Sequence, residues 1–369
     1  MSKMRDGVED LCMIKSVDNA EICKHLKIRL GREEIYTNIG SVLVVCNPFK
    51  WLNIYGPQYI QMYSSATTAN TAPHIYALAD SAYRRMMSES TSQAVIISGE
   101  SGAGKTEAAK GVLNFVSAVS GGGGDAERLK KVIHDTNPIL EGFGNAKTVR
   151  NDNSSRFGKY LEIKFDENGA PCSGSTLKFL LERTRVAFQG KGERNYHIFY
   201  ALCAGSNDEM KQNFGIGDAN AFQFLVGGGV TTVSGKNDAK EFAEIQQAMV
   251  TLGIDENMQW SIWQTLASIL HLGNVFFEGD QANICQQSHE SFQWACHLIG
   301  VTEDAMSTAL LTKFISTGKG ESFNLKNNVE QASAMRDSVC YVMYEKVFDL
   351  LIEKVNGALK SSRGGGGGE

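Results

Sequence analysis

The chain has 369 residues, of which 42% are hydrophobic and 21% charged, enough for one large or two fused globular subdomains. Its formal net charge is −5, so there is no electrostatic case for nucleic-acid binding. Eight cysteines without a CxxC pair, a charged N-terminus and no run of ~18 apolar residues favour a reduced, cytoplasmic protein without a secretory signal or membrane span.

Three apolar runs predict β-strands. Ser41–Cys46 (SVLVVC) and Gln93–Ser98 (QAVIIS) are continuous, which is typical of central strands buried on both faces. Lys159–Phe165 (KYLEIKF) alternates apolar and polar residues, as a half-exposed strand should.

Five segments have the pattern of helices. The segment 238–252 begins with Asp238 and Glu241, a capping-box pattern, and is followed by Gly253. The segment 259–272 is apolar on most sides and is therefore expected to be deeply buried. In chain order the expected helices span His74–Met87, Lys105–Val119 (with Ala108, Val112, Phe115 and Val119 inward), Asp238–Leu252, Gln259–Leu272 and Val329–Leu359.

The segment from Gly99, GESGAGKT, matches the phosphate-binding pattern G-x-x-x-x-G-K-[ST]. It follows the predicted strand 93–98 and opens the predicted helix 105–119, the context that this pattern requires. The glycines let backbone N–H groups converge on phosphate oxygens, and the helix N-terminus adds partial positive charge. Lys105 is expected to reach the β- and γ-phosphates and Thr106 to supply a hydroxyl to Mg²⁺. The residues expected around the nucleotide phosphates are Gly99, Glu100, Ser101, Gly102, Ala103, Gly104, Lys105 and Thr106.

Residues Asn151–Tyr160, NDNSSRFGKY, form a polar segment just before a predicted strand. On its own this segment would be interpreted as a polar turn. Paired with a phosphate loop about fifty residues upstream, it is interpreted as a loop that closes over a γ-phosphate.

GESGAGKT together with NDNSSRFGK strongly resembles myosin heads. The resemblance covers roughly residues 8 to 359 and rests on several independent motifs. The other matching segments are NPFKWLNIY (Asn47–Tyr55), APHIYALAD (Ala72–Asp80), LLERTRV (Leu180–Val186), ERNYHIFYAL (Glu193–Leu202) and LASILHLGNV (Leu266–Val275).

The resemblance implies an α/β fold: a P-loop NTPase core with a central, mostly parallel sheet, plus a helical subdomain like the upper 50 kDa region, in a truncated head. We expect the nucleotide-binding core at 1–200, the mainly helical subdomain at 201–359 and a Gly-rich disordered tail at 360–369. The glycine clusters at 121–124, 227–229 and 364–368 are expected to be flexible connections.

The resemblance also assigns roles to residues. Asn47, Pro48, Lys50 and Tyr55 would contact or frame the adenine of ATP. Lys105 and the segment 151–160, which corresponds to the family's first switch, would supply the catalytic groups. Asn151 and Ser154 would bind the γ-phosphate and position the attacking water. Ser155 would join Thr106 as a Mg²⁺ ligand, and Arg156 would form a salt bridge that locks the closed state.

The implied function is a myosin-type motor ATPase, which hydrolyses Mg·ATP and works on actin filaments in the cytoplasm, as part of the cytoskeleton. The sequence lacks the DIxGFE-type second switch, whose glutamate would pair with Arg156, so Arg156 is expected to have no partner. The alternative is a nucleotide-binding fragment or pseudo-motor without turnover. Most of the actin interface is absent, and light chains would bind only through a missing C-terminal region. A small-molecule kinase or GTPase is disfavoured because no Walker-type Asp or NKxD motif is evident.

Overall fold

The computed structural model describes residues 7–65, 71–121, 124–316 and 322–360. These residues form two compact units. Unit 1 comprises the described residues up to Lys131 together with Ile163–Ser173, and unit 2 comprises Val132–Glu162 and the described residues from Gly174 to Lys360. The functional boundary expected at residue 200 stays a prediction. Residues 361–369 of the expected tail lie outside the described residues.

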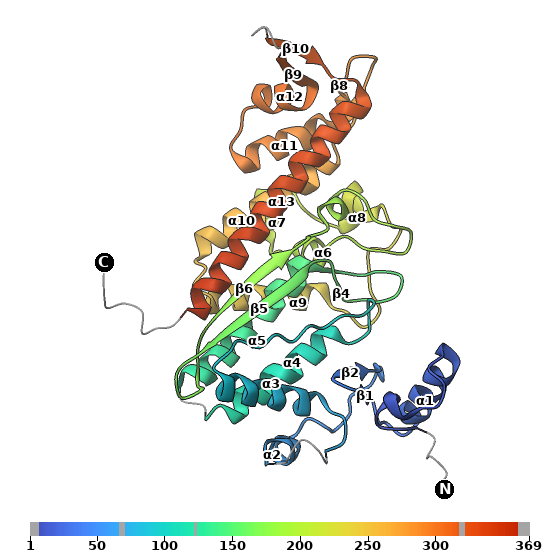
Figure 1. Cartoon of the computed structure of the whole chain (residues 1–369). Helices are drawn as coiled ribbons and strands as arrows, with labels where there is room; N and C mark the ends of the chain where they lie inside the picture. Colours follow the sequence, from blue (N-terminus) through green and yellow to red (C-terminus); the bar gives the residue numbers. More distant parts are fainter. Residues whose placement is uncertain (1–6, 66–70, 122–123, 317–321, 361–369) are drawn as a thin grey trace. The chain divides into compact units, whose positions relative to one another are not determined.

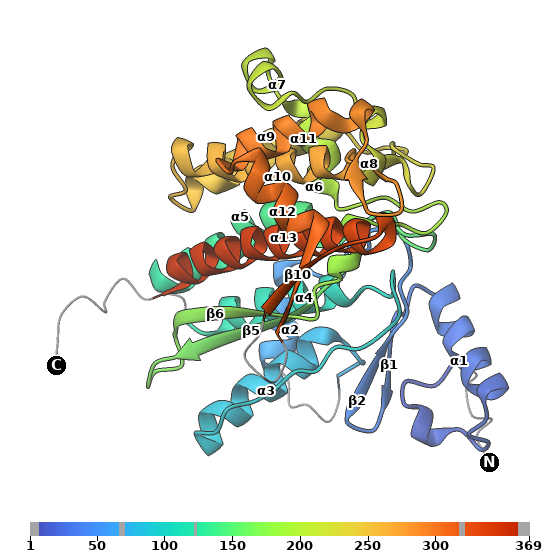
Figure 2. The ribbon, with the colours of Figure 1, turned by 90° about the horizontal axis from the view of Figure 1, so that it is seen from above.

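Unit 1 contains a β-hairpin and several helices (Figures 1 and 2). The hairpin turns at Gly40, which takes a left-handed φ of 56° that favours glycine. The elements, in chain order, are η1 (Leu11–Met13), α1 (Asn19–Gly31), β1 (Tyr36–Ile39), β2 (Val42–Val45), α2 (Pro57–Ser65), α3 (Ile75–Glu89) and α4 (Lys105–Val119). Helix α5 (Gly124–Gly144) and the strands β5 (Gly158–Phe165) and β6 (Pro171–Phe179) contribute residues to both units.

The strand predictions have mixed outcomes. The strand expected at 41–46 is confirmed as β2, but it pairs only with β1, antiparallel, and Val42 is 60% exposed. The strand expected at 159–165 is confirmed as β5, which pairs with β6. The strand expected at 93–98 is wrong, because these residues form no strand and Ile96 is 90% exposed.

The described strands therefore form only two-stranded sheets, and the central, mostly parallel sheet is not found among these residues. An apolar run becomes a buried strand only where neighbouring strands satisfy its backbone N–H and C=O groups. Within the described residues no strand pairs with 93–98, which is why the apolar pattern alone gave the wrong result there.

The core of unit 1 forms where α3 packs on α4. The helix expected at 74–87 is confirmed as α3, and the inward face expected for α4 is confirmed as well. Phe115 is fully buried and Ala108 nearly so, while Val112 and Val119 pack half-buried against the same cluster. The two helices approach closely at Gly111, where a Cβ atom would lie 3.0 Å from Cγ2 of Ile75.

His74 caps the N-terminus of α3 from inside an aromatic cluster. Its Nδ1 accepts a hydrogen bond from the backbone N–H of Tyr76 (3.0 Å), and its Nε2 donates to the carbonyl oxygen of Ile54 (3.1 Å). The ring stacks on Tyr63, with centroids 4.7 Å apart, and is only 4% exposed. Burial lowers the pKa of His74 to about 4, so the folded protein holds this side chain neutral.

The buried His74 makes stability depend on pH. In the unfolded chain its pKa is about 6.5, so between pH 6.5 and about 4 the unfolded state binds a proton that the folded state excludes. The free energy of unfolding should therefore fall as the pH falls through this window. We expect His74→Asn, which keeps a capping acceptor but does not titrate, to show a smaller fall between pH 7.5 and 5 in urea unfolding. The control His134→Asn replaces a histidine whose side chain is 86% exposed, and an equal flattening in both variants would contradict the assignment.

Unit 2 is mostly helical. The helix expected at 329–359 is confirmed, and Asn328 and Gln331 cap it reciprocally. In addition to its parts of α5, β5 and β6, unit 2 contains these described elements: β3 (Asn145–Ala146), β4 (Ser154–Ser155), η3 (Arg183–Val186), α6 (His197–Gly205), α7 (Asp208–Phe214), η4 (Ala219–Ala221), α8 (Gln223–Val226), α9 (Asp238–Thr251), α10 (Glu256–Gly273), β7 (Phe277–Glu278), β8 (Asn283–Ile284), η5 (Gln286–Ser288), α11 (His289–Ile299), α12 (Glu303–Leu311), β9 (Thr312–Ser316), β10 (Ser322–Lys326) and α13 (Val329–Leu359).

Helices α9 and α10 are confirmed with small differences: α9 begins at Asp238 as predicted and ends at Thr251, one residue early, while α10 ends at Gly273, one residue late. The side chain of Asn237, not Asp238, caps α9 by accepting from the N–H of Lys240. Helix α10 begins at Glu256, three residues earlier than expected, because Asp255 supplies its cap. The burial expected for α10 is confirmed, since the Trp263 side chain is 2% exposed and its ring centroid lies 4.9 Å from that of Phe242.

The glycine cluster at 227–229 is a tightly packed turn, and the expectation of a flexible connection is wrong here. A Cβ atom on Gly228 would lie 2.0 Å from the carbonyl oxygen of Glu193, so only glycine fits. The carbonyl of Gly228 also accepts a hydrogen bond from Gly192 N–H (2.8 Å). Of the first cluster, positions 122 and 123 lie outside the described residues, as does the whole cluster at 364–368.

Helix α13 is fastened to strand β6 by one side chain. Oδ1 of Asn356 accepts a hydrogen bond from the backbone N–H of Thr176 (2.6 Å), and its Nδ2 donates to the carbonyl of the same residue (2.9 Å). The side chains of Glu345 and Asp349 add ion pairs with Lys178 at 3.5 and 2.9 Å.

Across the described parts of the chain, no helix combines the length and apolar character needed to cross a bilayer.

Candidate functional site

The glycine-rich segment 99–106 is a compact loop that leads into α4. Gly102 and Gly104 have φ angles of 82° and 94°, a left-handed conformation that favours glycine. Gly104 is the N-cap of α4 and has no side chain to bond the N–H groups of the first turn. These N–H groups, with the positive end of the helix dipole, suit an anion such as a phosphate group.

The Lys105 ammonium group lies over this loop. Its Nζ donates to the carbonyl oxygens of Gly99 (2.6 Å) and Glu100 (2.8 Å). The lysine thus adds a full positive charge at the end of the helix where the dipole is positive. The next residue, Thr106, is exposed, and its hydroxyl is the type of oxygen ligand that Mg²⁺ accepts.

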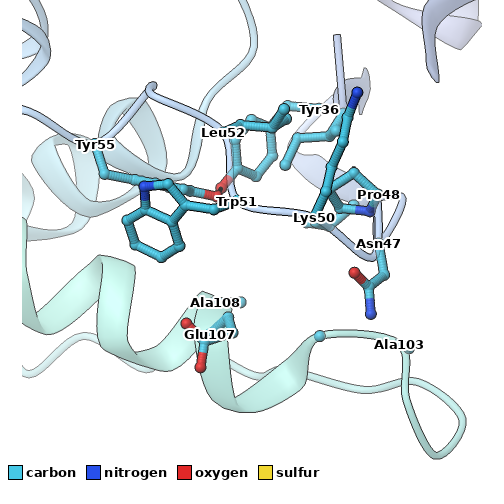
Figure 3. A pocket seen from close by; sticks show the side chains of 13 residues that line it. Tyr36, Asn47, Pro48, Lys50, Trp51, Leu52, Tyr55, Ala103, Glu107 and Ala108 are labelled. Atoms are coloured by element: carbon cyan, nitrogen blue, oxygen red, sulfur yellow. Dashed lines mark hydrogen bonds between the residues drawn. The ribbon is translucent and has the colours of Figure 1, made fainter. Parts of the chain in front are cut away.

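A cavity of about 90 Å³ lies beside the phosphate loop, several times the ~10–15 Å³ that one water molecule needs. Figure 3 shows the segment after β2 on one side of it, and α4 with Glu107 and Ala108 on the other. The cavity brings together all four residues expected at the adenine with two of the phosphate loop: Asn47, Pro48, Lys50, Tyr55, Ala103 and Gly104.

Asn47 ties the cavity wall to the phosphate loop. Its Nδ2 donates to the carbonyl oxygen of Gly102 (2.6 Å), and its Oδ1 accepts from the N–H of Phe49 (2.9 Å). Figure 3 shows the Asn47 side chain directed toward the loop that carries Ala103. One side chain therefore sets both the turn at 47–49 and the position of the phosphate loop relative to the cavity.

Asn47→Ala is expected to weaken Mg·ATP binding about three- to tenfold, because the net contribution of a hydrogen bond is ~0.5–1.5 kcal/mol. The measurement is the dissociation constant of a fluorescent ATP analogue, with Asn53→Ala as the matched control. Asn53 is an exposed asparagine of the same segment. Equal affinities for wild type and Asn47→Ala would show that the contact with Gly102 does not organise the site.

The cavity also has an aromatic wall, of which only Tyr55 was predicted from the sequence. The hydroxyl groups of Tyr36 and Tyr55 are 2.8 Å apart, and the rings of Trp51 and Tyr55 lie 5.8 Å apart. Burial raises the pKa of Tyr55, so its hydroxyl stays protonated. Flat, apolar surfaces of this kind suit the faces of a base. Trp51 could have been found inside the segment NPFKWLNIY, whereas Tyr36 comes from β1 and only the fold brings it here.

Lys50 lines the cavity with its aliphatic stem while its charge is engaged elsewhere. Its Nζ lies 2.6 Å from Oε1 of Glu33, and both side chains are more than half exposed. Such an exposed pair contributes only about 0–1 kcal/mol. The prediction that Lys50 borders the base site is therefore compatible with the structure, but its ammonium points away from Ala103 (Figure 3).

The segment predicted to sense the γ-phosphate lies in unit 2. Ser154 and Ser155 form β4, which pairs antiparallel with Asn145 and Ala146 of β3. Ser154 is 3% exposed, and its Oγ accepts from Nη1 of Arg156 (3.1 Å), whereas Ser155 is exposed. The strand alternation thus turns one serine inward and leaves the other available to an outside ligand.

Asn151 is held in a turn just before β4. Its backbone exchanges hydrogen bonds with Thr148, at 2.8 and 3.3 Å. Its side-chain Oδ1 accepts from the backbone N–H of Asn153 (2.9 Å). The amide expected to bind a γ-phosphate is therefore engaged within its own loop in this structure.

Arg156 has an acidic partner, and the expectation that it lacks one is wrong. Its Nε lies 2.6 Å from Oε2 of Glu182, and Glu182 also accepts from Nε of Arg185 (2.8 Å). Burial by itself raises the pKa of Glu182, but the hydrogen bonds and charges of Arg185 and Arg156 outweigh it and hold the pKa below its usual range. The segment Leu180–Val186 was matched as a family motif, yet nothing in its spacing revealed this contact.

The structure thus assembles the predicted residues in two groups. Unit 1 contains the phosphate loop and the cavity, and unit 2 contains Asn151, Ser154, Ser155 and Arg156. Among the described residues no group of three or more His, Cys, Asp or Glu side chains could hold a metal ion. Thr106 in unit 1 and Ser155 in unit 2 each have an exposed hydroxyl, a type of oxygen ligand that Mg²⁺ accepts.

Comparison with known proteins gives one consistent result. The chain matches the family model described as myosin head (motor domain) over residues 8–365. It is 42% identical over 363 residues to Myosin IB heavy chain of Dictyostelium discoideum, with 96% of this chain and 33% of that protein covered. It is 41% identical over 366 residues to Myosin heavy chain IB of Acanthamoeba castellanii (98% and 31% covered) and 40% identical over 366 residues to Unconventional myosin-Ia of Rattus norvegicus (97% and 43%).

The chain spans about a third of the length of the first two relatives and less than half of the third. The motif-based resemblance is confirmed by a family match that covers nearly the whole chain. The chain belongs to the myosin head (motor domain) family.

Proposed function

We propose that this chain is the Mg·ATP-binding part of a myosin-type motor ATPase that hydrolyses ATP in connection with actin filaments. The observation that carries the proposal is the hydrogen bond from Asn47 to Gly102 (2.6 Å), which joins an aromatic cavity to a glycine-rich phosphate loop. A base site and a phosphate site at this junction suit a nucleoside triphosphate.

The proposed roles follow from position and chemistry. The triphosphate would lie over segment 99–106, with Lys105 as its cation and Thr106 and Ser155 as ligands of Mg²⁺, which would screen the phosphate charge. Asn47, Pro48, Lys50 and Tyr55 would border the adenine. Asn151 and Ser154 would bind the γ-phosphate and orient the attacking water, and Arg156 would fix the closed loop by an ion pair.

Further parts of the proposal concern architecture and partners. A nucleotide core at 1–200 would carry the central, mostly parallel sheet of the P-loop NTPase fold that the myosin head family implies. A helical subdomain would follow at 201–359. The partner would be filamentous actin in the cytoplasmic cytoskeleton, with light chains bound only outside this sequence and no nucleic acid.

A second candidate is nucleotide binding without turnover. It is favoured by the pairing of Arg156 with Glu182 within the chain (2.6 Å), because this pairing occupies the arginine proposed to fix the closed loop. In this case the chain would bind Mg·ATP but would not assemble the arrangement that positions water for attack.

Steady-state Mg·ATP hydrolysis, measured with and without filamentous actin and beside direct binding of ATP, distinguishes these candidates. A motor ATPase predicts hydrolysis that actin accelerates. The second candidate predicts saturable ATP binding without phosphate release in either condition. If the chain bound no nucleotide at all, both candidates would be wrong.

A further inference from the structure

Asn153 is the central hydrogen-bonding residue of the segment between Asn151 and Ser154. Its side-chain Oδ1 accepts from Nδ2 of Asn145 (3.0 Å) and from Nε2 of His197 (3.2 Å), and its Nδ2 donates to Oε2 of Glu141 (3.1 Å). These partners come from β3, from the first residue of α6 and from α5. An amide bonded on both sides in this way has one orientation.

His197 is suited to be a permanent donor in this network. Its ring is 1% exposed, and burial, together with the charges of Lys236 and Arg194, lowers its pKa to about 2. The imidazole is therefore neutral and carries a single N–H. Within the described residues its Nδ1 has no hydrogen-bond partner, which assigns the proton to Nε2, the atom that faces Asn153.

The network acts on the residues that flank Asn153. The backbone N–H of Asn153 donates to Oδ1 of Asn151 (2.9 Å), and the next residue is the buried Ser154. A fixed Asn153 thus fixes the backbone between the two groups proposed to contact the γ-phosphate. Removing one of these hydrogen bonds would let the loop take other conformations. Only the fraction of molecules with the competent loop conformation could bind the γ-phosphate, so the apparent affinity would fall in proportion to that fraction.

We propose that His197 is a positioning residue that acts through Asn153 to hold the loop at 151–155 in the conformation that recognises a γ-phosphate, and so sets the preference for ATP over ADP. The inference rests on the proposed function. It does not require His197 to touch the nucleotide.

The location of His197 separates this role from a purely structural one. It begins α6, whose next residues, Ile198 and Phe199, are fully buried and hold the helix by apolar packing. Asn153, in contrast, is exposed. Loss of one hydrogen bond at this boundary is therefore expected to affect the loop more than the helix.

The test compares the affinities of the full chain for Mg·ADP and for the non-hydrolysable β,γ-imido analogue of Mg·ATP. His197→Phe keeps a flat ring but removes the donor, and we expect it to reduce the preference for the triphosphate about tenfold, the effect of one hydrogen bond, with the ADP affinity unchanged. His197→Gln, which places an N–H near the position of Nε2, should restore most of this preference. His134→Phe, at an 86% exposed histidine, is the matched control and should behave as wild type.

Asn153→Ala removes the same contact from the exposed side and covers the case in which His197→Phe does not fold. It should show the same loss of triphosphate preference. Wild-type preference in Asn153→Ala, or in a folded His197→Phe, would overturn the inference while leaving the proposed function in place. Absence of nucleotide binding by the wild-type chain would overturn both.

Discussion

Lys105→Ala is expected to weaken Mg·ATP binding by about 100-fold, since hydrogen bonds to charged groups contribute ~1.5–3 kcal/mol and each 1.4 kcal/mol is tenfold. In the structure Nζ of Lys105 is held by the carbonyls of Gly99 and Glu100, at the N-terminus of α4. No other lysine or arginine lies in the loop sequence GESGAGKT. Without this side chain, the phosphate loop would offer the triphosphate no full positive charge, only backbone N–H groups, hydroxyl groups and the helix dipole.

Isothermal titration with Mg·ATP measures this effect. The control is Lys110→Ala, which removes a lysine of the same helix that is 46% exposed and pairs with Glu107 at 2.9 Å. The control should bind as wild type, and both variants should unfold at the wild-type temperature because neither side chain is part of the core. If Lys105→Ala bound within threefold of wild type, the phosphate-loop assignment would be wrong.

Asp238→Ala is expected to lower the free energy of unfolding by about 3–5 kcal/mol, the cost of leaving a buried charge without its partner. The Arg194 side chain is fully buried, and its Nη2 lies 2.8 Å from Oδ1 of Asp238. Its guanidinium also stacks over the Tyr200 ring, 3.7 Å from the centroid. In the part of the chain that the structure describes, Nε and Nη1 of Arg194 have no partner, so Asp238 supplies its only ion pair there.

Urea unfolding of the single and double variants measures how much of this loss comes from leaving the Arg194 charge without a partner. Arg194→Met together with Asp238→Ala removes both charges, and we expect it to recover most of the loss because an apolar side chain tolerates this site. Lys240→Ala, at an exposed pair with Glu244 (3.6 Å), should change stability by less than about 0.5 kcal/mol. A loss for Asp238→Ala as small as that of Lys240→Ala would contradict the assigned cost.

Local patterns predicted much of this structure. The helices that became α3, α4, α9, α10 and α13 have their apolar residues at helical spacing, and neighbours along the chain largely decide whether such a segment is helical. The phosphate loop and the segment 47–55 were also found, because each is a short motif whose residues act together. Their meeting in one cavity was implied only by the resemblance to myosin heads.

Contacts between distant residues were not accessible from the sequence. The acidic partner of Arg156 lies 26 positions away at Glu182, and one hydrogen-bond partner of Asn153 lies 44 positions away at His197. The strand expected at 93–98 failed for the related reason that strand formation depends on neighbours elsewhere in the chain. The cap of α9 was misplaced by one residue because Asn237 and Asp238 both have capping side chains.

The contact of Asn356 with Thr176 has a consequence for how the β5–β6 sheet ends. The N–H and C=O groups of one strand residue point to the same side, so the amide of Asn356 occupies the place that a residue of an added strand would take. The side-chain amide of Asn356 thereby makes the two hydrogen bonds that the backbone of a further strand would make with Thr176. Since open strand edges promote association between chains, α13 also protects this edge of β6 from pairing with another molecule.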